Sequence, residues 1–164
     1  MNSHIAMRQV RAGTLCQWKV CSAPNAAQNG IVSASLAKHG FTGPSPIFEG
    51  EMGFMNQVTG PFSVDTKKFG NRENQSYAIS RTLTKLLPTN GEMQTAAWAA
   101  LAVRDKIPSL DIIATVHVET NRVGYDFLAK DPEKWRPATR ETADHSLPYT
   151  VARAVIDGVI TTET

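Results

Sequence analysis

The chain has 164 residues, of which 41% are hydrophobic and 20% charged, a composition typical of a globular protein and not of a disordered or collagen-like one. Seventeen basic and fifteen acidic side chains leave a formal net charge of +2. The two signs are interspersed, and no basic run is interleaved with aromatic residues, which argues against nucleic acid as a partner. The only cysteines, Cys16 and Cys21, are too few for a disulfide framework and wrongly spaced for a zinc or redox pair.

The first twenty residues contain Arg8, Arg11 and Lys19 and no sustained apolar run. We therefore expect neither a signal peptide nor a membrane span, and a cytoplasmic protein by default. The histidines have no partner residues at metal-ligand spacing. Accordingly, the sequence predicts no metal site and no cofactor.

Small and apolar residues recur at near-helical spacing over residues 24–39, which predicts a helix ended by Gly40. The abundance of alanine and serine lets neighbouring backbones approach closely, so we expect this helix to be buried inside a larger helical body. Residues 41–76 are rich in glycine and proline, and we expect them to be mostly irregular, with a short helix near residues 48–58.

Two later segments, residues 77–85 and 111–119, alternate apolar and polar residues as β-strands with one covered face do. Between them, residues 91–106 have an alanine-rich helical pattern. A last helix is expected to begin at Ser146 and to end at Gly158. The predicted fold class is therefore α+β, with a strand–helix–strand unit.

Two lysines, Lys19 and Lys85, each stand just ahead of a small-residue helix. A helix start offers unpaired N–H groups and a partial positive charge, and an ammonium group beside it completes a cradle for a carboxylate or phosphate. Lys85 also has the parity of the apolar face of its expected strand, where an ammonium group requires an anionic partner. The sequence thus predicts a small anionic ligand, although a solvated surface charge is the usual role of a lone lysine.

Several segments together resemble the MmgE/PrpD family of 2-methylcitrate dehydratases and cis-aconitate decarboxylases. They are Gly40-Phe41-Thr42-Gly43, Phe48-Glu49-Gly50, and Arg140-Glu141-Thr142-Ala143-Asp144-His145-Ser146-Leu147-Pro148-Tyr149 ahead of Asp157-Gly158. The segment from Lys19 through Asn25-Ala26-Ala27 is similar to the family's first active-site lysine segment, and Lys85 with Pro88 is similar to its second.

The resemblance implies a lyase site, a hydro-lyase or decarboxylase site for small polycarboxylates, between an all-helical domain and a smaller α+β lid. In that interpretation residues 1–72 are the tail of the helical domain, residues 73–145 the lid domain, and residues 146–164 a returning helix and truncated end. Lys19 would lie on the helical side and Lys85 on the lid side. Closing the lid would then bring two ammonium groups onto one di- or tricarboxylate.

The sequence also departs from the family. Family decarboxylases carry a histidine three residues after the first lysine and another five residues after the second, where this chain has Ser22 and Asn90. Neither side chain serves as a general acid or base near neutral pH. His145 is a candidate for that role, although a structural hydrogen bond beside a helix start is the simpler interpretation. Tyr125 follows the second expected strand, about where the family lid offers a substrate-facing tyrosine.

The acid–base histidine and aspartate that the family places in its early helical domain have no counterpart in this chain. We therefore expect a fragment of a lyase-family protein that is inactive alone and that retains a lysine-based carboxylate-binding part, with Lys85, Lys19, Asn90, Ser22 and Tyr125 as binding residues. Two alternatives stay open, a stand-alone carboxylate-binding protein and a non-catalytic oligomerisation module. The small-residue helix would bury its apolar face in a dimer or larger homo-oligomer.

Overall fold

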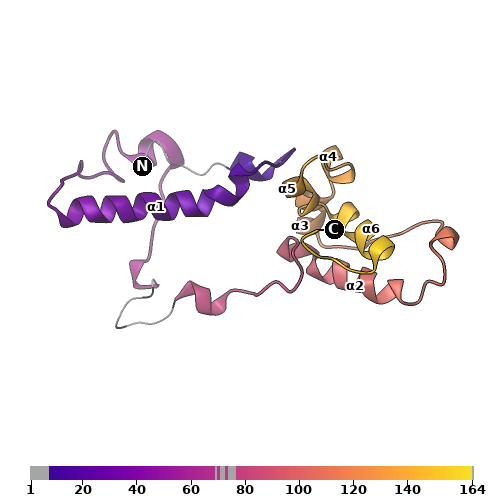
Figure 1. The fold of residues 1–164 in the computed structure, drawn as a ribbon. Coiled ribbons are helices and arrows are strands. Elements are labelled where there is room, and N and C mark those ends of the chain that lie inside the picture. The colour runs from indigo at the N-terminus through magenta and orange to yellow at the C-terminus, as the bar shows by residue number, and fades with distance from the viewer. Residues whose placement is uncertain (1–7, 69, 71–72, 74–76, 164) are drawn as a thin grey trace. The chain divides into compact units, whose positions relative to one another are not determined.

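A computed structural model of the chain describes residues 8–68, 70, 73 and 77–163 (Figure 1). The chain divides into two compact units, one made of Met1–Gln28 with Lys85–Thr164 and the other of Asn29–Thr84. The α-helices are α1 (Trp18–Lys38), α2 (Gln94–Arg104), α3 (Arg122–Leu128), α4 (Pro132–Trp135), α5 (Arg140–Ala143) and α6 (Leu147–Asp157). Single helical turns lie at Arg8–Arg11, Met55–Thr59, Thr66–Lys68, Ala78–Arg81, Gly91–Met93 and Leu110–Ile112.

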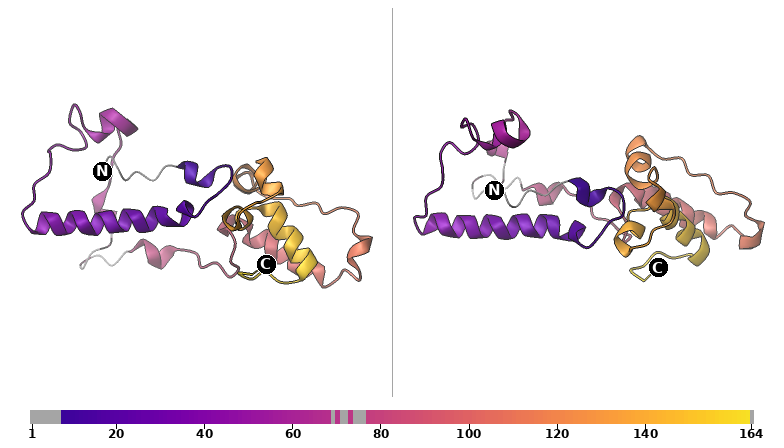
Figure 2. Two further views of the ribbon diagram at one scale, coloured as in Figure 1. Left: turned by 45° about the horizontal axis from the view of Figure 1, so that its top comes forward. Right: turned by 90° about the horizontal axis from the view of Figure 1, so that it is seen from above.

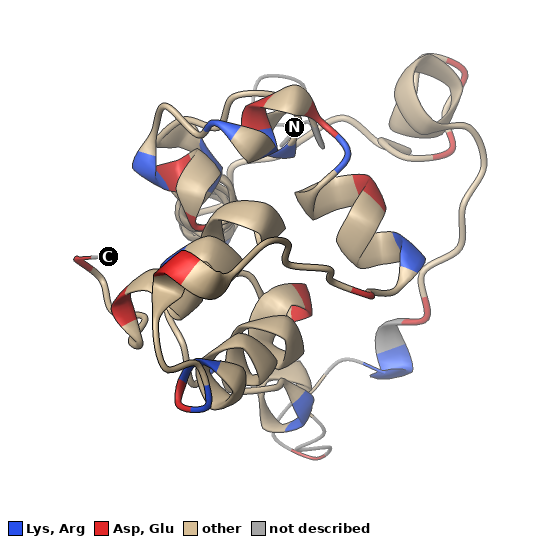
Figure 3. Ribbon diagram, turned by 90° about the vertical axis from the view of Figure 1, so that its right-hand side faces the viewer, with Lys and Arg blue, Asp and Glu red and all other residues tan. Residues whose placement is uncertain are grey.

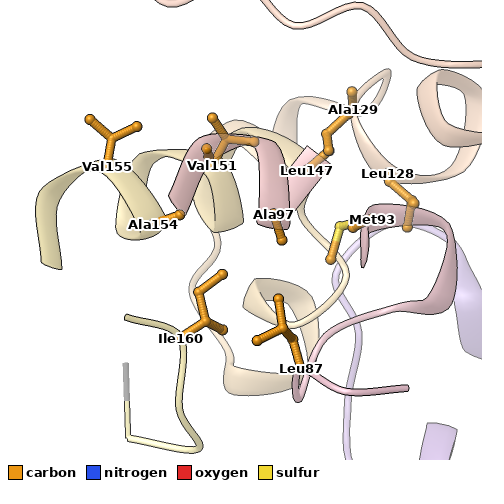
Figure 4. Packing of buried hydrophobic residues seen from close by; sticks show 11 residues of the cluster. Leu87, Met93, Ala97, Leu128, Ala129, Leu147, Val151, Ala154, Val155 and Ile160 are labelled. Atoms are coloured by element: carbon orange, nitrogen blue, oxygen red, sulfur yellow. The ribbon is translucent and has the colours of Figure 1, made fainter. Parts of the chain in front are cut away.

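The hydrophobic core of the first unit lies where α2 packs against α6 (Figure 2). Ala97 of α2 and Ala154 of α6 have no exposed surface, and both point into the space between these helices (Figure 4). Small side chains at this contact let the two backbones approach closely. The core consists of Leu87, Met93, Ala97, Ala100, Leu128, Ala129, Leu147, Val151, Ala154, Val155 and Ile160.

The helices expected over residues 91–106 and after Ser146 are confirmed, and the second of them has the expected caps at both ends. The Ser146 side chain accepts a hydrogen bond from the Tyr149 N–H at 3.1 Å, which satisfies a free donor of the first turn of α6. Gly158 follows α6 with a φ of 70°, the left-handed conformation that glycine adopts without strain. The side chain of Asn90 similarly accepts from the Glu92 N–H at 2.9 Å ahead of α2.

The predicted α+β fold is wrong, because the residues that the structure describes contain no β-strand and the chain is mainly helical. Residues 77–85 contain a 3-10 turn at Ala78–Arg81, and residues 113–121 have neither helical structure nor a paired strand among the described residues. Apolar alternation shows only that one face of a segment can be covered. A strand also requires a neighbouring chain that accepts and donates its backbone hydrogen bonds.

The helix expected over residues 24–39 is present as part of α1, which begins earlier, at Trp18. Its predicted burial is wrong, since none of the residues of α1, all of which the structure describes, is buried. Ile31 is 72% exposed and Leu36 46% exposed. Helical periodicity is a property of the segment alone, whereas burial needs a neighbouring surface.

In the second unit the short helix expected near residues 48–58 appears as a π-helical turn at Met55–Thr59. Beside it, the rings of Phe48, Phe54 and Phe62 meet edge to face, with centroids 6.1–6.4 Å apart. This arrangement is the one that aromatic quadrupoles prefer. The expected domain boundaries at residues 72 and 145 stay predictions.

Across the described residues, no helix has both the length and the apolar character needed to cross a bilayer.

The contact between α2 and α6 predicts a clear difference between two similar substitutions. Ala154→Leu should lower the free energy of unfolding by about 1–3 kcal/mol, because the larger side chain forces these closely packed helices apart. Ala152→Leu, on the exposed side of α6, should change it by less than about 0.5 kcal/mol. Urea denaturation followed by circular dichroism measures both values, and equal stabilities for the two variants would contradict the described packing.

Candidate functional site

The start of α1 is held against α5 by two threonines, the buried Thr142 and the half-buried Thr139. The Leu15 N–H donates to Thr142 Oγ1 at 2.8 Å, and Thr139 Oγ1 donates to the Leu15 carbonyl at 2.8 Å. Leu15 is 1% exposed and Thr142 is not exposed at all. This contact joins residues more than a hundred positions apart and fixes where the first turn of α1, which carries Lys19, lies.

Lys19, Asp144 and His145 form what we call the Lys19 cluster. The Lys19 Nζ lies 3.1 Å and 3.3 Å from the two carboxylate oxygens of Asp144 and 2.9 Å from His145 Nδ1. Asp144 Oδ1 also lies 2.5 Å from His145 Nδ1. The side chains of Lys19 and His145 are 12% and 15% exposed and that of Asp144 is 38% exposed, so the ion pair is enclosed on the side of Lys19 and His145 and open to solvent at the carboxylate.

His145 Nδ1 lies within hydrogen-bond distance of both Asp144 Oδ1 and Lys19 Nζ. With a proton on Nδ1 the ring donates to the Asp144 carboxylate, and with the proton on Nε2 it accepts from the Lys19 ammonium group. His145 also lines a hollow of about 510 Å³ whose other residues include Asn90 and Phe127. A carboxylate that orients an imidazole in this way is a common arrangement for general acid–base chemistry.

Asp144 is ionised at neutral pH. Burial by itself raises the pKa of this carboxyl, but hydrogen bonds and charge from His145 and Lys19 outweigh burial and hold the pKa below its usual range. The carboxylate therefore serves two donors at once.

On the other side of Asp144 is a cavity of about 310 Å³, here called the Lys85 cavity. It is lined by the cationic side chains of Lys85, Arg140 and Arg153 and by Asp144. Each cation already has one partner and keeps further N–H donors. The partners are the Thr89 carbonyl for Lys85 at 2.9 Å, the Thr162 carbonyl for Arg140 at 3.0 Å and the Asp157 carboxylate for Arg153 at 2.7 Å.

The loop that carries Lys85 is shaped by Gln94. Its Oε1 accepts from the N–H groups of Leu86 and Leu87, both at 3.1 Å, and its Nε2 donates to the Leu87 carbonyl and to Thr89 Oγ1. Lys85 is thus held by a hydrogen-bonded loop and not by a strand end, which corrects the position expected from the sequence. The side chain still reaches an anion-suited cavity.

The structure gathers most of the predicted site residues around Asp144. The Asn90 N–H donates to the Asp144 carbonyl at 3.0 Å, which ties the Lys85 loop to the Lys19 cluster. Ser22 lies three residues after Lys19 on α1, and its Oγ is buried without a hydrogen-bond partner among the described residues.

Tyr125 is not part of this group. It is 54% exposed and lines an apolar cavity of about 350 Å³ together with Trp135. The structure therefore does not bring it to the lysines.

Four residues of the site were not predicted from the sequence: Asp144, Arg140, Arg153 and the buried Lys134. The first three lie in or near residues 140–149, the segment that resembles the family, and this position in the sequence was the signal that could have indicated them. The partner of Arg153, Asp157, is local, but the pairing of Asp144 with Lys19 joins residues 125 positions apart and nothing local indicates it. Figure 3 shows basic and acidic residues scattered among the helices and not collected by sign.

In the part of the chain that the structure describes, no three His, Cys, Asp or Glu side chains are grouped so that they could hold a metal ion.

The enclosed Lys–Asp–His cluster beside a cationic cavity defines a candidate site for a small anion in a mainly helical protein. Residues 1–67 match the MmgE/PrpD N-terminal domain, and residues 87–164 match the MmgE/PrpD C-terminal domain. The chain belongs to the MmgE/PrpD family. No solved structure matches it.

Because the pKa of Asp144 is lower in the folded than in the unfolded chain, the ionised carboxylate contributes stability above its unfolded pKa of about 4. That contribution is lost as the pH falls through the folded pKa. Asp144→Asn should thus lower the free energy of unfolding by about 0.5–1 kcal/mol at pH 7, since partial exposure screens the pair. The difference from wild type should shrink below about pH 4.

Urea denaturation between about pH 3 and pH 7 measures this difference. Asp126→Asn, which removes an exposed pair with Arg122, is the matched control and should change little. A deficit in Asp144→Asn that stays constant with pH would contradict the ion-paired state.

Proposed function

We propose that this chain provides the ligand-binding part of a lyase, a hydro-lyase or decarboxylase that acts on a small di- or tricarboxylate in the cytoplasm. The observation that supports this is the Lys85 cavity, where cationic side chains from three segments meet beside the Lys19 cluster. Its volume of about 310 Å³ is at the small end of the range for ligand pockets, as a small acid requires.

The charges of the cavity favour an acid with more than one carboxylate. Three cations line it against the single carboxylate of Asp144, which is already engaged by Lys19 and His145. Charge-assisted hydrogen bonds from lysine and arginine to carboxylates are among the stronger polar contacts in proteins. A guanidinium group adds a planar fork that matches carboxylate geometry.

His145 is the residue suited to hold a proton during such a reaction, because Asp144 and Lys19 orient its ring and an imidazole both donates and accepts. Ser22 and Asn90, however, stand where the family's decarboxylases carry histidines. We therefore propose that this chain binds a carboxylate but does not by itself dehydrate 2-methylcitrate or decarboxylate cis-aconitate.

Binding of citrate-like acids should depend on Lys85. We expect Lys85→Met to weaken binding at least about tenfold, since it removes a charge that lines the cavity. Lys19→Met should weaken binding less, because Lys19 acts through Asp144 and does not line the cavity. Isothermal calorimetry of citrate at low salt measures the affinities, with the exposed Lys106→Met as control. Equal affinities in all four proteins would show that the lysines are ordinary surface charges.

A second candidate function, self-association, is favoured by the exposed apolar residues of α1. Ile31 and Val32 are 72% and 50% exposed, which is unusual for neighbouring large aliphatic side chains. We expect a dimer or larger homo-oligomer that Leu36→Glu converts to monomer, because a charge at an apolar contact is costly to bury. Light scattering across a wide concentration range tests this, with the exposed Ser35→Glu as control. A wild-type monomer of 17.9 kDa at every concentration excludes the candidate.

A further inference from the structure

Lys134 is the largest fully buried side chain among the described residues. It lies on α4, is 1% exposed, and its Nζ has no hydrogen-bond partner within the described part of the chain. An ammonium group held this way is costly, because burial removes its hydration and nothing replaces it. Such a group either loses its proton or obtains an anionic partner.

The backbone of Lys134 is firmly fixed. Its N–H donates to the Asp131 carbonyl at 3.0 Å, and its own carbonyl accepts a hydrogen bond from Ser146 Oγ, the side chain that caps α6. Next to it, Trp135 Nε1 donates to the Ala129 carbonyl at 2.7 Å. The burial of the amine therefore follows from the packing of α4 against α6 and is not a chance rotamer at the surface.

Four charged groups act electrostatically on Lys134. Asp131 and Glu133 come from its own segment, Lys19 from α1 and Asp144 from the turn between α5 and α6. Burial lowers the pKa of Lys134, the three carboxylates oppose that effect and Lys19 adds to it. Asp144 is already bonded to Lys19 and His145, so it is not a counterion reserved for Lys134.

We propose that Lys134 is a positioning residue that takes up a proton from solvent when a carboxylate ligand occupies the Lys85 cavity. Asp144 links the two places, because it lines the cavity and stands two residues before Ser146, whose Oγ donates to the Lys134 carbonyl. A bound acid brings further negative charge to the side of Asp144, which favours the ammonium form of Lys134 over the neutral amine. The added positive charge in turn strengthens the hold on the acid, since binding and protonation are reciprocal.

This inference rests on the proposed carboxylate binding and adds a specificity rule to it. Lys134 does not line the cavity, so it senses the total charge of the ligand and not its shape. Binding of a tricarboxylate should therefore make the protein take up more protons than binding of a monocarboxylate of similar size.

The test is calorimetry of citrate in two phosphate-free buffers of different ionisation enthalpy, at several values between about pH 8 and pH 10. For wild type the binding heat should depend on the buffer and report a net uptake of protons on citrate binding. Lys134→Met should lose that uptake and bind about tenfold more weakly. Lys134→Arg, whose charge is permanent, should lose the uptake but retain most of the affinity.

The exposed Lys130→Met is the control and should behave as wild type. An uptake that persists unchanged in Lys134→Arg overturns the inference while leaving the proposed function in place. Absence of citrate binding to the wild type overturns both. If Lys134→Met does not fold, the arginine variant still decides, because a structural role for the buried stem alone would leave the proton uptake unaltered.

Discussion

Asp144 is the group on which the candidate site depends. Its carboxylate accepts from Lys19 and from His145, its backbone carbonyl accepts from Asn90, and its side chain forms part of the wall of the Lys85 cavity. Through these contacts one residue joins α1, the Lys85 loop and the start of α6. The ionised state of Asp144 is stabilised by the same two partners that it orients, so the geometry and the charge of the cluster support each other.

The three lysines of this region differ in how they are held, and the differences suit different roles. Lys19 is enclosed and paired with a carboxylate, so its charge is largely balanced by the charge of Asp144. Lys85 donates only to a backbone carbonyl and keeps its full charge for a ligand in the cavity. Lys134 is buried without a hydrogen-bond partner among the described residues, and burial lowers its pKa.

Sequence reasoning succeeded where the signal was local and failed where it was not. The α2 and α6 helices, the cap of α6 at Ser146 and the left-handed Gly158 all follow from residues within a few positions of each other. The expected strands failed because residues 113–121 have the alternation of a strand but no paired neighbour among the described residues. The burial predicted for α1 failed for the same reason, since a covered face needs something to cover it.

By itself the sequence determined the family and the helices α1, α2 and α6, because each of these follows from residue type and short-range spacing. Only the tertiary structure decided which groups meet. The Leu15–Thr142 hydrogen bond places Lys19 beside Asp144, and packing of α4 against α6 buries Lys134. Such pairings join residues more than a hundred positions apart or depend on what encloses a side chain, and local spacing carries no information about either.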